Sequence, residues 1–240
     1  MASLLKVAEE SGVWTLTLSR PEKRNALSAG LVEDLIDSIA RAHASHARAL
    51  VFCGAGSNFS AGFDFSAYEN TSEGDLVLRF VRIEQMLQAI ASSPCATFAF
   101  AQGKNFGAGV DLIAACRTRI AAPNATFRMP GLKFGLVLGT RRFGAIVGAD
   151  KARRILEASK IFGAEEASAM GFVHKIAEQG SWPGEISAAL QTAGALDPDS
   201  HSALTRVLSA NNHDADMAEL VRSAARPGLK TRIARYLASS

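Results

Sequence analysis

Two glycine-rich segments contain the residues of this sequence that could carry out chemistry. The first runs from Gly54 to Gly62 (GAGSNFSAG) and the second from Gly103 to Gly109 (GKNFGAG). Each follows a short apolar run typical of a buried strand and precedes a helical pattern. The first N–H groups of a helix have no partner within it, and glycine lets a ligand oxygen approach them. Two such amides meeting at one oxygen would form an oxyanion hole, although a tight strand-to-helix turn would explain either segment alone.

Other motifs that bind phosphate or form acyl intermediates fit poorly. The stretch 107–109 (GAG) continues to Leu112, where the dinucleotide-binding fingerprint requires Gly or Ala, and no Gly-Lys-Ser/Thr phosphate loop occurs. Ser60 lacks the first glycine of a nucleophile elbow. His43 and His46 are three residues apart on an expected helix without an evident third ligand, so they are interpreted as a surface pair and no metal site is predicted.

Five blocks of the chain resemble, in order, the signature of the enoyl-CoA hydratase/isomerase (crotonase) family. They are RPEKRNA from Arg20, NFSAGFD from Asn58, GKNFGAGVD from Gly103, FRMPG from Phe127 and FGAEEASAMGFV from Phe162. The resemblance implies an α/β fold, a spiral of ββα units with a helical C-terminal region. It also implies acyl-CoA thioesters as substrates, with coenzyme A as part of the substrate and no separate cofactor.

The resemblance also implies roles for individual residues. The backbone amides of Phe63 and Ala108 would form the oxyanion hole, and Asp111 stands where hydratases of the family have a catalytic glutamate. The residues that would line the coenzyme A pocket are Arg24, Ala26, Ala61, Phe63, Asp64, Phe65 and Ala108. Two simpler interpretations stay open, because Asp64 could only cap a helix and Asp111, in a first helical turn, could only complement the helix dipole.

The acid and base groups depart from the family pattern. Hydratases of the family usually have a second glutamate directly after Met-Pro or Gln-Pro, where this chain has Gly131. Hydration suits two carboxylates, because water must lose a proton while the α-carbon gains one. We therefore expect an enzyme that stabilises an enolate with Asp111 as its lone carboxylate, nominally an enoyl-CoA hydratase or isomerase. An acyl-CoA decarboxylase and a non-catalytic binder of CoA thioesters are the alternatives.

Three arginines near these blocks have open roles. Arg141 and Arg142 follow a segment that is a few residues shorter than in hydratases. They could recognise a carboxylate or a CoA phosphate, but a solvated pair at a helix start is the interpretation favoured. Arg128 lies in a block that lines the pocket in the family, and a contact to substrate is the less favoured interpretation of it.

The pattern of apolar residues predicts β-α-β units with helices covering a parallel sheet. Strands are expected at 13–19, 49–53, 95–101 and 118–122, and helices from Ser28, at 73–91 and at 111–116. From about Trp182 only helical segments follow. We expect a core domain at 1–180 and a helical region at 181–240, which packs on the core or on a neighbouring subunit of a homotrimer or homohexamer.

Composition narrows the class of protein. The 240 residues are 48% hydrophobic and 20% charged, as in an ordinary globular protein. A net charge of +3 without a basic run argues against a nucleic-acid partner. No signal-peptide pattern and no apolar stretch of roughly 18 residues is evident. We therefore expect a soluble cytoplasmic protein with no membrane partner and with Cys53, Cys95 and Cys116 reduced.

Overall fold

The computed structural model describes residues 3–239 apart from 194, 196, 198–199, 201–202, 205–206 and 209–211. Its main sheet has the strand order β1-β2-β3-β4-β6-β9. The strands are β1 (Leu5–Glu10), β2 (Val13–Leu18), β3 (Ala49–Gly54), β4 (Ala96–Ala101), β6 (Thr118–Ala121) and β9 (Lys175–Ile176). All neighbours pair in parallel except β1 and β2, which form an antiparallel hairpin. The mainly parallel α/β architecture with a helical C-terminal region is the one expected.

The apolar pattern did not predict several short strands or the helices between residues 140 and 169. A second sheet, in the order β5-β7-β8, joins β5 (Lys104–Phe106), β7 (Thr126–Arg128) and β8 (Phe162–Gly163). β5 lies inside the second glycine segment, which was expected to be a loop. Strand β1 was also missed, because only Leu5 of its six residues is buried and no alternation results. β1 forms by pairing with the neighbouring strand β2, and β5 forms by pairing with β7, which follows about twenty residues later in the sequence.

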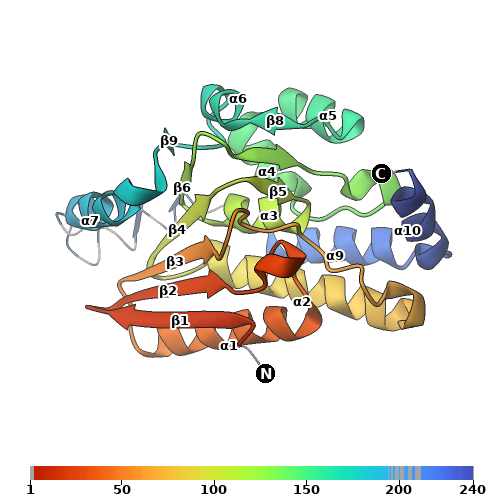
Figure 1. Cartoon of the computed structure of the whole chain (residues 1–240), viewed down its shortest axis with the longest axis horizontal. Helices are drawn as coiled ribbons and strands as arrows, with labels where there is room; N and C mark the ends of the chain where they lie inside the picture. The colour runs from red at the N-terminus through yellow and green to blue at the C-terminus, as the bar shows by residue number, and fades with distance from the viewer. Residues whose placement is uncertain are drawn as a thin grey trace.

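The helices cover both faces of the main sheet. They are α1 (Ala29–Ala44), α2 (Glu73–Ala91), α3 (Ala108–Ala115), α4 (Thr140–Val147), α5 (Ala149–Ala158), α6 (Ala164–Ala169), α7 (Trp182–Ala193), α9 (His213–Ala224) and α10 (Leu229–Ala238). Short 3₁₀ turns occur at η1 (Pro21–Lys23), η2 (Tyr68–Asn70), η3 (Gly131–Phe134) and η4 (Gln179–Ser181). Figure 1 shows α1 and α2 running along one side of the sheet and α7 at its far end.

Alternating side chains of the strands point to two separate apolar cores. On β3, Leu50 and Phe52 join the main core with α1 and α2, whereas Ala49 and Val51 join a smaller core with α7. This alternation is the two-residue period of a strand covered on both faces. The first helix begins as expected at Ser28, whose Oγ accepts a hydrogen bond from the N–H of Leu31.

The helices after Trp182 pack on the rest of the chain. The ring of Trp182 contacts that of Phe100 of β4 in a tilted arrangement, with ring centroids 4.8 Å apart. Leu220 of α9 and Ile233 of α10 are buried in the main core. The region therefore completes the core formed by the earlier residues, and α10 lies against η3 beside the second glycine segment.

Two further expectations concern membranes and cysteines. Among the residues that the structure describes, no helix is both long and apolar enough to cross a bilayer. The three cysteines are free, as expected, although Cys53 is only partly buried.

Replacing Ile233 by Ala tests whether α10 folds with the core. Ile233 is fully buried, so the change should lower the free energy of unfolding by about 2–4 kcal/mol in a single transition followed by circular dichroism in urea. The matched control is Ile161→Ala, because Ile161 is 56% exposed and its loss should cost less than about 0.5 kcal/mol. A separate early transition, or no difference between the two variants, would contradict this packing.

Candidate active site

A cavity of about 520 Å³ lies where the loop after β2, the two glycine segments, η3 and α10 meet. Its wall contains all the residues expected to line a coenzyme A pocket, together with Asp111 and Gly131. These expected residues are Arg24, Ala26, Ala61, Phe63, Asp64, Phe65 and Ala108. Segments more than a hundred residues apart in sequence thus meet at one hollow.

Phe63 and Ala108 both belong to this wall, and their backbone amides have few partners. Phe63 pairs with Leu27 in an isolated parallel bridge. The hydrogen bonds of this bridge involve the neighbours of Phe63 and not Phe63 itself: the N–H of Leu27 donates to the carbonyl of Gly62 (2.7 Å), and the carbonyl of Leu27 accepts from the N–H of Asp64 (3.3 Å). Ala108 is the first residue of α3, so its N–H has no acceptor within the helix. Among the described residues neither amide has a hydrogen-bond acceptor. Both are available to an oxygen in the cavity.

Glycines bring these two amides together. A Cβ on Gly62 would overlap the carbonyl oxygen of Phe106 and lie 3.1 Å from the amide nitrogen of Ala108. A Cβ on Gly109 would lie 2.6 Å from the carbonyl oxygen of Ser60. The two segments therefore touch backbone to backbone, and side chains at these positions would separate them.

Gly107 decides where α3 begins. Its dihedral angles, φ +47° and ψ −120°, are accessible to glycine and strained for other residues. Its carbonyl accepts from the N–H groups of Val110 and Asp111, which starts the helix at Ala108. The expected start at Asp111 was wrong by three residues, because the apolar pattern does not record this turn.

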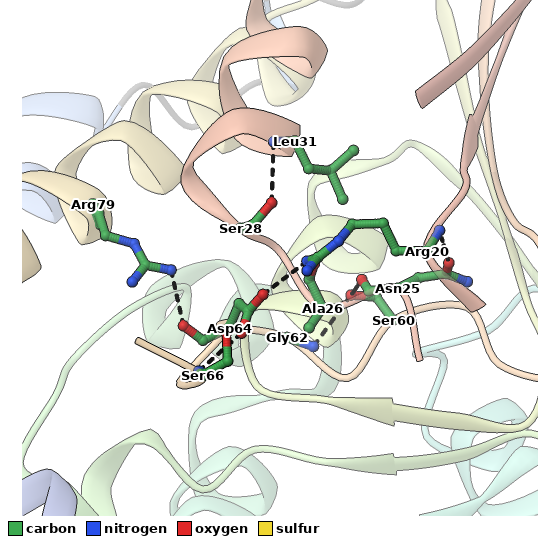
Figure 2. A network of polar contacts seen from close by, with 10 residues as sticks. All are labelled: Arg20, Asn25, Ala26, Ser28, Leu31, Ser60, Gly62, Asp64, Ser66 and Arg79. Carbon is green, nitrogen blue, oxygen red and sulfur yellow. Dashed lines mark hydrogen bonds and ion pairs between the residues drawn. The ribbon is translucent and has the colours of Figure 1, made fainter. Parts of the chain in front are cut away.

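A polar network holds the first glycine segment from behind (Figure 2). The Arg20 guanidinium donates to Oδ2 of Asp64 (2.8 Å) and to the carbonyl of Ala26 (2.6 Å), while Oδ1 of Asp64 accepts from the N–H of Ser66 (2.9 Å). Burial opposes the charge, but the hydrogen bonds from Ser66 and Arg20 hold the pKa of Asp64 below its ordinary value. Asp64 therefore pairs with Arg20 and closes a turn onto Ser66. It does not cap a helix, since the next helical turn begins after Ala67.

The turn before the first helix is strained and tied to the same segment. Arg24 and Asn25 both have positive φ, +50° and +53°. The Asn25 amide donates to the carbonyls of Ala55 (2.9 Å) and Asn58 (2.8 Å), and Oγ of Ser60 donates to the Asn25 carbonyl (2.9 Å). In the sequence, the only indication that Asn25 links this turn to the first glycine segment was its place in the block RPEKRNA from Arg20.

Asp111 is the only cavity carboxyl that is fully buried and has no ion-pair partner among the described residues. It is 3% exposed, and its Oδ1 has no hydrogen-bond donor among them. Burial raises the pKa of Asp111 well above its ordinary value; the charge of Arg142 opposes this shift and that of Glu84 adds to it. Gly139 faces the carboxyl so closely that a Cβ there would overlap Oδ1. Asp111 thus belongs to the cavity wall, and its place in the first turn of α3 also suits the helix dipole.

The three arginines with open roles have separate partners. Arg142 is buried and binds Glu84 of α2, so the interpretation of a solvated pair is wrong for it. Arg141 is half exposed and pairs with Asp216 (2.7 Å). Nε of Arg128 donates to the carbonyl (3.3 Å) and hydroxyl (3.2 Å) of Ser159, and Arg128 is not part of the cavity wall.

Sequence reasoning missed Glu84, although a signal was present. The buried face of α2 includes Phe80, Ile83 and Leu87, and Glu84 lies among them. A carboxylate on the buried face of a helix requires a partner, because an unpaired buried charge is costly.

Aromatic rings form the apolar side of the cavity. Phe63 stacks on Phe80 (4.3 Å between centroids). Phe65, Phe134 and Tyr236 contact one another, with ring centroids 5.9 Å (Phe65–Phe134), 5.2 Å (Phe134–Tyr236) and 6.3 Å (Phe65–Tyr236) apart. Tyr236 and the neighbouring Leu237 come from α10, so the C-terminal helix supplies wall residues that were not expected. The charged residues Glu22, Lys23 and Arg24 also line the cavity.

Comparisons with known proteins point to one family. The family model described as enoyl-CoA hydratase/isomerase matches residues 8–231. The Mycobacterium tuberculosis protein named probable enoyl-CoA hydratase echA6 is 34% identical over 190 residues, which are 77% of this chain and 76% of that protein. The crystal structure of a Bordetella parapertussis protein, provisionally named an enoyl-CoA hydratase/isomerase, is 59% identical with a TM-score of 0.96 and covers 99% of both chains.

A more distant structure shows the same fold. The enoyl-CoA hydratase from Bacillus halodurans is 21% identical, with a TM-score of 0.84 over 97% of this chain and 100% of its own. The crotonase fold implied by the five sequence blocks is therefore confirmed. With a family model that matches nearly the whole chain, this protein belongs to the enoyl-CoA hydratase/isomerase family.

Proposed function

We propose that the protein acts on acyl-CoA thioesters by stabilising an enolate and moving a proton with Asp111. One observation carries the proposal: the unpaired amides of Phe63 and Ala108 and the buried carboxyl of Asp111 belong to a single cavity wall. A thioester oxygen bound by two backbone donors gains most when negative charge develops on it, as in an enolate.

Asp111 suits reversible proton transfer. A carboxyl whose pKa is raised by burial is a better match to a proton acceptor and donor at neutral pH than an ordinary aspartate, which stays ionised. The other carboxylates of the wall are less suitable, because Asp64 is bound by Arg20 and Glu22 is exposed. A single buried carboxyl favours a proton shift between two carbons, as in isomerisation, over addition of water by two carboxylates.

Gly131 occupies the place of the second carboxylate of hydratases. It lies in the wall at the start of η3, and its φ is not in the left-handed region. A Cβ there would lie 3.0 Å from the carbonyl oxygen of Leu136, so a side chain requires a small shift of that loop. The site is therefore proposed to work without a second carboxylate.

Lys23 and Arg24 are proposed to meet the phosphates of coenzyme A. Both belong to the cavity wall together with the amide-bearing residues Phe63 and Ala108. Cationic side chains and phosphates form strong charge-assisted hydrogen bonds. A cytoplasmic location and assembly into a homotrimer or homohexamer are proposed from the family relationship alone, and light scattering measures the assembly directly.

A turnover screen by liquid chromatography and mass spectrometry tests the proposal, because chromatography separates the 2-enoyl and 3-enoyl isomers, which have equal mass. The full chain is incubated with 2-enoyl-, 3-enoyl-, hydroxyacyl- and malonyl-type CoA thioesters, and calorimetry measures binding of acetyl-CoA and acetoacetyl-CoA. Conversion between 2-enoyl and 3-enoyl thioesters is expected. Loss of CO₂ would support the decarboxylase instead, and binding without turnover would support a non-catalytic binder. No binding at millimolar concentration would overturn all three.

Replacing Asp111 by Asn should lower kcat by about 10²–10⁴, the usual worth of a positioned acid or base, with little change in the affinity for CoA thioesters. The change keeps the size of the side chain and removes its proton-transfer group. The matched control is Asp150→Asn, because the Asp150 side chain is 84% exposed in the first turn of α5. Unchanged turnover in Asp111→Asn would sink the assignment and favour the decarboxylase, which needs the amides but no base.

Replacing Gly109 by Ala should separate the two glycine segments, since the new Cβ would lie 2.6 Å from the carbonyl oxygen of Ser60. Displacing one oxyanion donor costs about 10²–10³ in kcat. The control is Gly74→Ala, also near the start of a helix, where the nearest atom to the new Cβ is 3.8 Å away. Steady-state kinetics with circular dichroism as a check of folding distinguishes the cases. Equal activity of the two folded variants would contradict the role of the paired segments.

A further inference from the structure

A buried ion pair lies next to the wall of the cavity, between α2 and α4. Nη1 of Arg142 donates to Oε2 of Glu84 (3.1 Å), and Nη2 of Arg142 donates to Oε1. The side chains are 1% exposed for Glu84 and 12% for Arg142. Gln88 adds a hydrogen bond to Oε1 of Glu84 (2.9 Å) and another to the carbonyl of His213 (2.9 Å). The pair is therefore held rigidly from both sides.

Such a pair is an expensive way to stabilise a fold. Removing two charges from water costs more than their attraction usually returns, and apolar residues of similar size often do as well. The exposed pair of Glu33 and Arg82, also with one partner on α2, does not carry this cost to the same extent. A role beyond stability is the better explanation of Glu84 and Arg142.

The charges of this pair act on Asp111. Helix α3, which carries Asp111, packs against α2, α4, β4 and β5. From α2 the group that acts on Asp111 is Glu84, and from α4 it is Arg142. Strand β4 (ATFAFA) has no titratable residue, and on β5 Lys104 is exposed. Arg142 lowers the pKa of Asp111 and Glu84 raises it.

The arrangement resolves a conflict within the site. A fully buried carboxyl without a donor to Oδ1 would stay protonated, because burial disfavours its ionised form. A free arginine would bind the carboxylate directly and keep it ionised. Glu84 instead binds both terminal nitrogens of Arg142, and no hydrogen bond joins Arg142 to Asp111 among the described residues, so Arg142 acts on Asp111 through its charge. Gly139 faces Asp111 and precedes α4 directly, which fixes Arg142 relative to the carboxyl.

We propose that Glu84 and Arg142 are positioning residues that keep the buried carboxyl of Asp111 able both to hold and to release a proton. The inference rests on the proposed function in one respect, that Asp111 carries the proton. The further step is that the ion pair of Glu84 and Arg142 sets the proton affinity of the Asp111 carboxyl.

The test measures the proton affinity of Asp111 without any substrate. Infrared spectra of the full chain are recorded across pH, and the carboxyl band of Asp111 is identified by difference from Asp111→Asn. Glu84→Gln removes the anion and should lower the titration midpoint, with about a tenfold loss of proton affinity. The double variant Glu84→Gln, Arg142→Gln keeps a hydrogen-bonded neutral pair but loses the cation. Its titration midpoint should therefore lie at a higher pH than that of Glu84→Gln alone, with about a tenfold gain in proton affinity.

Two controls separate this effect from packing. Arg142→Lys keeps the charge and should leave the midpoint near that of the unchanged protein. Glu33→Gln removes the carboxylate of the exposed pair and should not move it. The pH profile of turnover should shift in the same direction as the midpoint in each variant, which a purely structural role would not cause.

The outcomes distinguish this inference from the proposed function. If Glu84→Gln and the double variant share one midpoint, the charge of Arg142 does not act on Asp111 and the inference is overturned, even if Asp111→Asn abolishes turnover. If the midpoints move as expected but no CoA thioester is turned over, the proposed function fails and the electrostatic role stands. Single replacement of Arg142 by Gln is avoided, because it leaves Glu84 buried without its cation and strongly destabilises the fold.

Discussion

At Gly62 and Gly109 the backbone of one loop touches the backbone of another, and the site depends on this contact. Gly62 faces the carbonyl of Phe106 and the amide of Ala108, and Gly109 faces the carbonyl of Ser60. No side chain fits between them, so two amides from different β-α connections lie at one cavity. The Arg20–Asp64 pair and the hydrogen bond from Ser60 to the Asn25 carbonyl hold the first loop against the turn before α1.

Burial of charged and polar groups at the same site costs folding free energy. A carboxyl is buried with an oxygen that lacks a donor among the described residues, and an ion pair is buried beside it. Neither arrangement is the cheapest way to fill a core, since apolar residues of equal size avoid both penalties. The two apolar cores on either side of the main sheet offset this cost. Because the apolar cores offset this penalty, the fold can keep the carboxyl of Asp111 buried away from water.

The C-terminal helix links the outer part of the fold to the chemistry. Tyr236 and Leu237 of α10 contribute to the cavity wall, and Ile233 of the same helix is buried in the main core. One short element therefore belongs both to the core and to the cavity wall. Changes in this helix are expected to affect the shape of the cavity as well as stability.

The sequence by itself determined what depends on local pattern. The apolar periods located α2 at its observed bounds and β2, β3, β4 and β6 to within a residue, and the five blocks indicated the family and residues of the cavity wall. Strand β5 and the start of α3 were not predicted, because a three-residue strand and a turn at a glycine are too short to produce a periodic pattern of apolar residues.

Only the tertiary structure decided which charges meet. Glu84 and Arg142 are 58 residues apart, and Asp111 lies on a helix between them in the sequence. Their opposing effects on its pKa depend on how α2, α3 and α4 pack. The strength of an electrostatic interaction depends on distance and burial, and neither of these can be read from the identity of a residue in a sequence.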